Sequence, residues 1–111
     1  MSKRTPKAPA HLSATTRRWW SQVAADFELE SHHLRLLTLA GEAWDRCVQA
    51  REQVAAEGAT YRNRFNEPRP HPAVAIERDA RLAFARMVRE IGLDGTPDPD
   101  PRPPGLGGRY A

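Results

Sequence analysis

The chain has almost no cysteine and no long apolar run, and each shortage excludes a class of protein. Cys47 is the only cysteine in 111 residues, so no disulfide can form within the chain. The apolar runs are a few residues long, whereas a membrane-spanning helix needs about 20. The basic N-terminus also lacks the apolar segment of a signal peptide. We therefore expect a soluble, intracellular protein.

The residue patterns of catalysis and metal binding are missing as well. His32 and His33 are adjacent, so on a helix they point apart and cannot chelate one ion. No Cys-x-x-Cys, His-Glu-x-x-His or glycine-rich phosphate loop occurs. Cys47 falls on an apolar helical face, which indicates a small buried hydrophobe. We predict that the protein is not an enzyme and holds neither a metal nor a cofactor.

Acidic residues are absent from the first 20 positions, which carry five basic ones. A second basic group lies in the central loop, where three arginines face Glu67 alone. Clustered positive charge favours phosphate binding, because counterions are released from the nucleic acid. The alternative is a solvated arginine-rich surface. The candidate DNA-binding residues are Lys3, Arg4, Lys7, Arg17, Arg18, Arg62, Arg64 and Arg69.

Composition divides the chain into three parts. Residues 1–11 form a basic N-terminal arm, and residues 12–93 form a helical domain with a loop at 59–71. Residues 94–111 form a tail rich in proline and glycine, whose Asp-Pro alternation favours polyproline-like extension. This tail is either a docking peptide or a disordered terminus. About 80 foldable residues make a marginal core, so we expect a homo-oligomer.

Three helices can be predicted from their capping residues. Ser13 is a good N-cap for a helix over residues 14–27. The second helix is expected to start after Ser31, as its N-cap, and to end at Glu57, with Gly58 as the left-handed residue that follows. The third has Pro72 in its first turn and ends at Gly92.

Apolar residues along the two long helices alternate in steps of three and four, which suits helices packed side by side. The fold is therefore predicted to be mainly all-α, with the short first helix packed on a long antiparallel helical hairpin. The positions are Leu37, Ala40, Trp44, Cys47, Arg51 and Val54 in one helix and Ala73, Ile76, Ala80, Ala83 and Met87 in the other.

Some apolar residues are left for a contact between subunits. Trp19 and Trp20 point about 100° apart on a helix, so one can enter the core while the other faces a neighbour. Leu34 and Leu36 lie off the apolar seam of the second helix. These four residues are the candidate oligomer interface.

The loop over residues 59–71 is predicted to be a short β-hairpin or an ordered extended loop. Tyr61 and Phe65 favour extended backbone, and the prolines from Pro68 to Pro72 hold the return stretch extended. Aromatic residues mixed with arginines are typical of nucleic-acid surfaces. Alternatively, the two rings hold the loop against the helices.

The order of these signals resembles the small terminase subunit family of tailed bacteriophages and prophages, over residues 9–93. Two positions differ from the family, which often has aspartate in place of His33 and asparagine in place of His71. The matching marks are Pro9-Ala10-His11-Leu12-Ser13, the tryptophan that follows, Glu42-Ala43-Trp44-Asp45 in the long helix, Gly58, Pro72-Ala73 and Gly92-Leu93.

The resemblance implies a non-enzymatic DNA-packaging component in the cytoplasm of a bacterial host. Such subunits form ring-shaped oligomers that recognise double-stranded viral DNA and deliver it to the large terminase subunit, which carries the ATPase and the nuclease. Two alternatives remain. A helical DNA-binding regulator is one, although it needs a shorter turn than residues 59–71 provide. The other is a structural adaptor that binds only protein.

Overall fold

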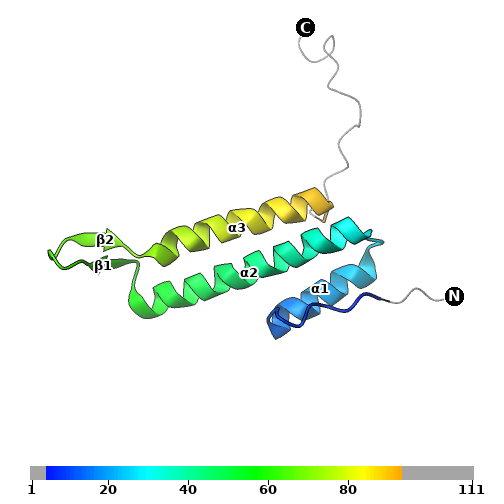
Figure 1. Ribbon diagram of the computed structural model, residues 1–111, viewed down its shortest axis with the longest axis horizontal. Coiled ribbons are helices and arrows are strands. Elements are labelled where there is room, and N and C mark those ends of the chain that lie inside the picture. Colours follow the sequence, from blue (N-terminus) through cyan, green and yellow to red (C-terminus); the bar gives the residue numbers. More distant parts are fainter. Residues whose placement is uncertain (1–4, 94–111) are drawn as a thin grey trace, which may run out of the picture.

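The computed structural model describes residues 5–93, which form three helices and one small β-hairpin (Figure 1). In chain order these are α1 (Ala14–Asp26), α2 (Ser31–Glu57), β1 (Thr60–Arg62), β2 (Pro68–Pro70) and α3 (Pro72–Ile91). Helices α2 and α3 run antiparallel, α1 lies on the other side of α2, and the β-hairpin extends from the far end (Figure 1). The predicted mainly all-α fold is confirmed, and the loop is a β-hairpin. The predicted tail over residues 94–111 lies outside the described residues.

The starts of the helices use both expected and unexpected caps. The Ser13 hydroxyl accepts a hydrogen bond from the Thr16 backbone N–H, as predicted. The prediction of Ser31 as a cap is wrong, because Ser31 is already helical and Glu30 is the N-cap of α2. The Nδ1 atom of His33 accepts the Glu30 backbone N–H at 3.3 Å.

His71 closes the base of the β-hairpin and starts α3. Its Nδ1 atom accepts the Ala73 backbone N–H at 3.0 Å, so a ring nitrogen acts as the helix cap. Its Nε2 atom lies 2.9 Å from a carboxylate oxygen of Glu57, and its backbone N–H donates to the Ala59 carbonyl. This one buried side chain therefore connects the end of α2 to the start of α3.

The two long helices end at glycines with different conformations. Gly92 is left-handed, with φ 89° and ψ 22°, and Leu93 donates its N–H to the Val88 carbonyl. Gly58 has φ 90° but ψ 158°, so the predicted left-handed conformation is wrong there. Instead the chain extends directly into β1, in a conformation that only glycine adopts readily.

The core forms along the predicted seam. Leu37, Ala40 and Cys47 of α2 are fully buried, and Ala73 and Ala80 of α3 are buried against them. The alanines let the two helices approach closely. A second cluster joins α1 to α2 and contains Leu12, Trp20, Val23 and Leu37.

A set of hydrogen bonds to Asp45 attaches the start of α1 to the middle of α2. Its carboxylate accepts the Ser13 backbone N–H at 2.8 Å, the Ser13 hydroxyl at 2.8 Å and the Thr16 hydroxyl at 2.6 Å. One turn away, Gly41 leaves room for this approach, because a Cβ atom there would lie 3.0 Å from the Thr16 methyl group and 3.1 Å from Leu12. We call Ser13, Thr16 and Asp45 the Asp45 clamp.

The Asp45 clamp predicts a specific loss of stability in acid. Burial alone would raise the pKa of Asp45, but hydrogen bonds from Thr16 and Ser13 outweigh it and hold the pKa below its ordinary value. The clamp therefore stabilises the fold above the unfolded-state pKa of about 3.9, and this stabilisation is lost as pH falls through the lower folded-state value. Asp45→Asn should cost about 1–3 kcal/mol at pH 7, and the cost should fall as pH drops below the folded-state pKa of Asp45. Urea denaturation at a fixed protein concentration measures both.

The matched control is Asp79→Asn, which removes an exposed carboxylate whose one ion-pair partner within residues 5–93 is Arg78. It should change the unfolding free energy little at either pH. Coincident pH profiles for the two variants would show that the Asp45 clamp contributes nothing specific.

Candidate functional site

The β-hairpin is the most exposed part of the described fold. Its strands pair antiparallel, with Thr60 opposite Pro70 and Arg62 opposite Pro68, and every strand residue is exposed. The Tyr61 and Phe65 side chains are 46 % and 67 % exposed. Neither ring is buried, and Phe65 in particular has most of its surface in solvent.

The turn between the strands is fixed by its own hydrogen bonds. The side-chain oxygen of Asn63 accepts the backbone N–H groups of Phe65 and Glu67, at 2.9 and 3.0 Å. The Asn63 backbone N–H donates to the Glu67 carbonyl, and Asn66 takes a positive φ of 61°, which asparagine tolerates. We call residues 63–67 the hairpin tip.

Two of the three hairpin arginines carry uncompensated charge. Arg62 donates to the Asn66 carbonyl at 2.7 Å, and the Arg64 guanidinium lies 4.9 Å from the centre of the Phe65 ring. Within residues 5–93, neither has a carboxylate at ion-pair distance, whereas Arg69 lies 3.7 Å from Glu67. The tip therefore presents positive charge beside an exposed ring.

The other predicted DNA-binding residues lie elsewhere. Lys7, Arg17 and Arg18 surround one open depression between the arm and α1. Arg17 also donates to the carbonyls of Ala10 and Leu12, so it helps to hold the arm against α1. Lys3 and Arg4 are outside the described residues. Because α1 lies along the part of α2 away from the hairpin (Figure 1), the basic residues form two separate regions.

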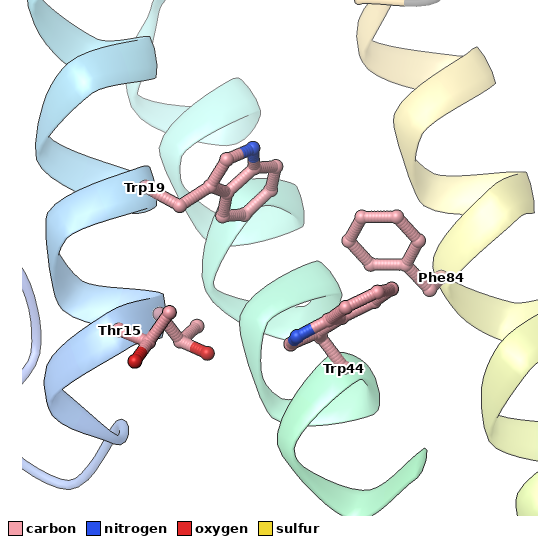
Figure 2. Close-up of a pocket in the computed structure, with 5 residues that line it drawn as sticks. Thr15, Trp19, Trp44 and Phe84 are labelled. Atoms are coloured by element: carbon pink, nitrogen blue, oxygen red, sulfur yellow. The ribbon is translucent and has the colours of Figure 1, made fainter. Parts of the chain in front are cut away.

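An aromatic groove lies between α1 and α3, over the middle of α2. Figure 2 shows Trp19 of α1, Trp44 of α2 and Phe84 of α3 turned toward a shared space, a cavity of about 310 Å³. The Phe84 ring centre lies 5.6 Å from that of Trp19 and 5.0 Å from that of Trp44. Thr15 and Thr16 complete the lining. We call this cavity the aromatic groove.

The four candidate interface residues differ in exposure. Trp20 is buried inside the subunit, and its indole N–H donates to the Thr38 hydroxyl at 3.2 Å. Leu34 and Leu36 are half-buried on α2. Trp19 is half-buried and lines the aromatic groove. A role in subunit contact stays a prediction for all four, and Trp19 is the tryptophan with a face toward open space.

The titratable groups between α2 and α3 form a structural connection. Glu77 accepts hydrogen bonds from the Cys47 thiol at 3.2 Å and from Arg51 at 3.1 Å, and it pairs with Arg81. Burial raises the pKa of Cys47, so the thiol stays protonated and donates. Among residues 5–93 no three His, Cys, Asp or Glu side chains gather as metal ligands would. No helix in that range is long and apolar enough to cross a membrane.

Comparison with known proteins identifies the family. A family model described as phage terminase, small subunit, matches residues 16–97. The chain belongs to the phage terminase small subunit family. The match includes the hairpin, most of α1 and every residue that lines the aromatic groove except Thr15. Searches of curated proteins and of solved structures found no match.

Sequence reasoning missed several residues that shape this terminase small subunit. The predicted seam omits Phe84, because Ala83 continues the alternating spacing. Phe84 comes four residues after Ala80, and this spacing could have placed it on the same helical face. Gly41 is a glycine inside a predicted helix, where glycine lowers helix stability by about 1 kcal/mol relative to alanine. Its presence there could have indicated a close packing contact. The role of Asp45 could not be predicted, because its partners Ser13 and Thr16 are about 30 positions away in the sequence. It was noted only within the family motif Glu42-Ala43-Trp44-Asp45.

The hairpin tip predicts a local effect of substituting Asn63. Asn63→Ala removes the acceptor of the Phe65 and Glu67 N–H groups, so the tip should open while the helices keep their stability. Hydrogen exchange of those two amides should accelerate on the order of tenfold, with helical amides unchanged. Asn66→Gly is the control, because glycine accepts the positive φ at that position. Equal exchange in both variants would mean that Asn63 does not fix the tip.

Proposed function

We propose that this terminase small subunit is a non-catalytic, DNA-binding component of a phage packaging motor that works in the cytoplasm of the bacterial host. It assembles into a homo-oligomeric ring, binds double-stranded viral DNA and presents it to the large terminase subunit, which supplies the ATPase and the nuclease. Family membership supports this role, and the observation that carries DNA binding is the exposed hairpin with its two uncompensated arginines.

Phosphate binding is the interaction that the hairpin favours. A guanidinium group donates to phosphate oxygens in a forked geometry, and binding releases counterions from the duplex. Arg62 and Arg64 are exposed and have no competing carboxylate within the described range. Each subunit supplies only a few such contacts. Repetition around a ring would multiply them into strong binding.

Assembly is supported by the shape of the apolar surface. The core of the described domain is small, and the aromatic groove leaves Trp44 37 % exposed at its floor. A neighbouring subunit that covered this groove would bury apolar area that the isolated chain leaves in water. Trp19, Leu34 and Leu36 are the candidate contact residues that keep exposed surface, whereas Trp20 is buried inside the subunit.

The two alternatives make different predictions. A DNA-binding regulator needs a short turn that delivers a recognition helix to the major groove, but α2 and α3 are joined here by a β-hairpin. A protein-binding adaptor would use the aromatic groove and ignore DNA. Salt-dependent binding to duplex DNA by the purified full chain separates the adaptor from the other two.

Neutralising hairpin arginines should weaken DNA binding on all sequences alike, because phosphate contacts carry no sequence information. Arg62→Ala/Arg64→Ala should reduce the salt dependence of the affinity by about 0.9 in slope for each phosphate that the variant no longer neutralises. Deletion of residues 1–8 tests the arm in the same way. Titration with duplex DNA at several salt concentrations measures affinity and slope together.

The matched control removes the same charge from α3. Arg78 and Arg86 are exposed and already paired with Asp79 and Glu90. Arg78→Ala/Arg86→Ala should therefore leave the affinity and slope close to those of the wild type. If all three variants bind like wild type while their oligomers stay intact, DNA contact by these regions is refuted and the adaptor gains support.

Truncating Trp19 should dissociate the assembly. The loss of a buried aromatic anchor commonly costs about 2 kcal/mol or more at an interface. Native mass spectrometry or light scattering should show wild type as an oligomer at micromolar concentration and Trp19→Ala as smaller species. Val74→Ala, an exposed apolar position on α3 outside the groove, is the control, and circular dichroism checks that both variants remain helical. A monomeric wild type would contradict the proposed ring.

A further inference from the structure

The hairpin tip holds an aromatic ring largely in solvent, outside the cores of the fold. Among the large apolar side chains of residues 5–93, Phe65 is the most exposed, at 67 %. It belongs to neither core cluster, and its ring lies against the Arg64 guanidinium. Leaving a phenylalanine side chain in water forgoes about 1.5–3 kcal/mol of burial. A ring in this position is suited to a contact outside the subunit.

The backbone beneath the ring is already in place before any partner arrives. Asn63 accepts the Phe65 N–H, Arg62 donates to the Asn66 carbonyl, and Asn66 supplies the positive φ that closes the turn. The Asn63 side-chain amide also donates to Glu67 at 3.2 Å. A fixed turn loses little conformational entropy on binding, which favours insertion of the ring into a narrow site.

The positive charge of Arg62 and Arg64 around Phe65 favours a negatively charged partner. The Arg64 guanidinium covers one side of the Phe65 ring at 4.9 Å, and Arg62, at the end of β1 next to the tip, has no carboxylate at ion-pair distance in the described range. The aromatic groove of a second copy of this chain could accept a ring, but no carboxylate among the described residues lines it to pair with these arginines. Duplex DNA instead offers a phosphate for each arginine. Between those phosphates lie stacked base pairs, whose flat apolar faces suit an aromatic ring.

We propose that Phe65 inserts between adjacent base pairs of duplex DNA while Arg62 and Arg64 contact the flanking phosphates, the Arg64 guanidinium leaving the face of the Phe65 ring to reach its phosphate. This inference rests on the proposed DNA-binding function and adds its mode of contact. An apolar wedge between base pairs partly unstacks them and kinks the duplex. The hairpin therefore bends the DNA that it binds, and it prefers pyrimidine–purine steps, which unstack most easily.

The test compares full-length Phe65→Ala with Phe65→Trp. Phe65→Ala should weaken duplex binding by about tenfold, because base–aromatic stacking is removed. Its salt slope should equal that of the wild type, since no charge is removed. Phe65→Trp should bind like the wild type. Relaxation of closed circular plasmid by a topoisomerase in the presence of each protein reports unwinding, which wild type and Phe65→Trp should produce and Phe65→Ala should not.

The control is Leu82→Ala, which removes an apolar side chain of comparable exposure, 57 %, from α3. It should leave binding and unwinding unchanged. Normal binding and unwinding by Phe65→Ala, with Arg62→Ala/Arg64→Ala still defective, would overturn the wedge and leave the proposed function standing. A change of oligomer mass in Phe65→Ala would also overturn it, by making the ring a subunit contact. Absence of duplex binding by wild type would instead refute the proposed function itself.

Discussion

The Asp45 carboxylate, hydrogen-bonded to Ser13 and Thr16, decides where α1 lies. A 13-residue helix is marginal on its own in water, so α1 depends on docking. The Asp45 clamp fixes its first turn against the middle of α2, and Trp20 and Val23 then reach the core near Leu37. Because one face of α1 is fixed in this way, Trp19 on the next face points toward Phe84. The aromatic groove is therefore a consequence of the clamp.

Local signals predicted the parts of this fold that depend on local chemistry. The Ser13 cap and the Gly92 end follow from hydrogen bonding within a few residues, and the structure confirms both. The alternating seam is confirmed at buried positions such as Leu37 and Cys47, but Trp44 on the same seam is 37 % exposed. The cap of α2 was predicted one residue late, because Ser31 and Glu30 both have acceptor side chains and only the backbone decides between them. Gly58 was assigned the common helix-ending conformation, whereas the adjoining strand requires an extended ψ.

The candidate site was harder to predict from the sequence, because it depends on which distant segments of the chain lie together in the fold. The charge count found two basic groups but could not say how far apart they lie, and in the structure α1 lies along the part of α2 away from the hairpin. The exposure of Phe65 could not be deduced from composition, since an aromatic residue in a loop packs inward as readily as outward. The two positions that differ from the family pattern are explained by structure: His33 and His71 each use a ring nitrogen as acceptor for a backbone N–H at a helix start.

Because α2 is long, the hairpin at one end and the α1 contacts toward the other can be altered by substitution independently. Its 27 residues span about 40 Å, with the β-hairpin beyond one end and the contacts of α1 toward the other. No backbone of α1 lies near the hairpin, so a substitution at the tip leaves the core around Leu37 as it was. Under the proposed function, a change in the strength of DNA binding would require changes in only a few tip residues. Hairpins could then diverge between related phages, or be exchanged between them, while the surfaces used for assembly stay the same.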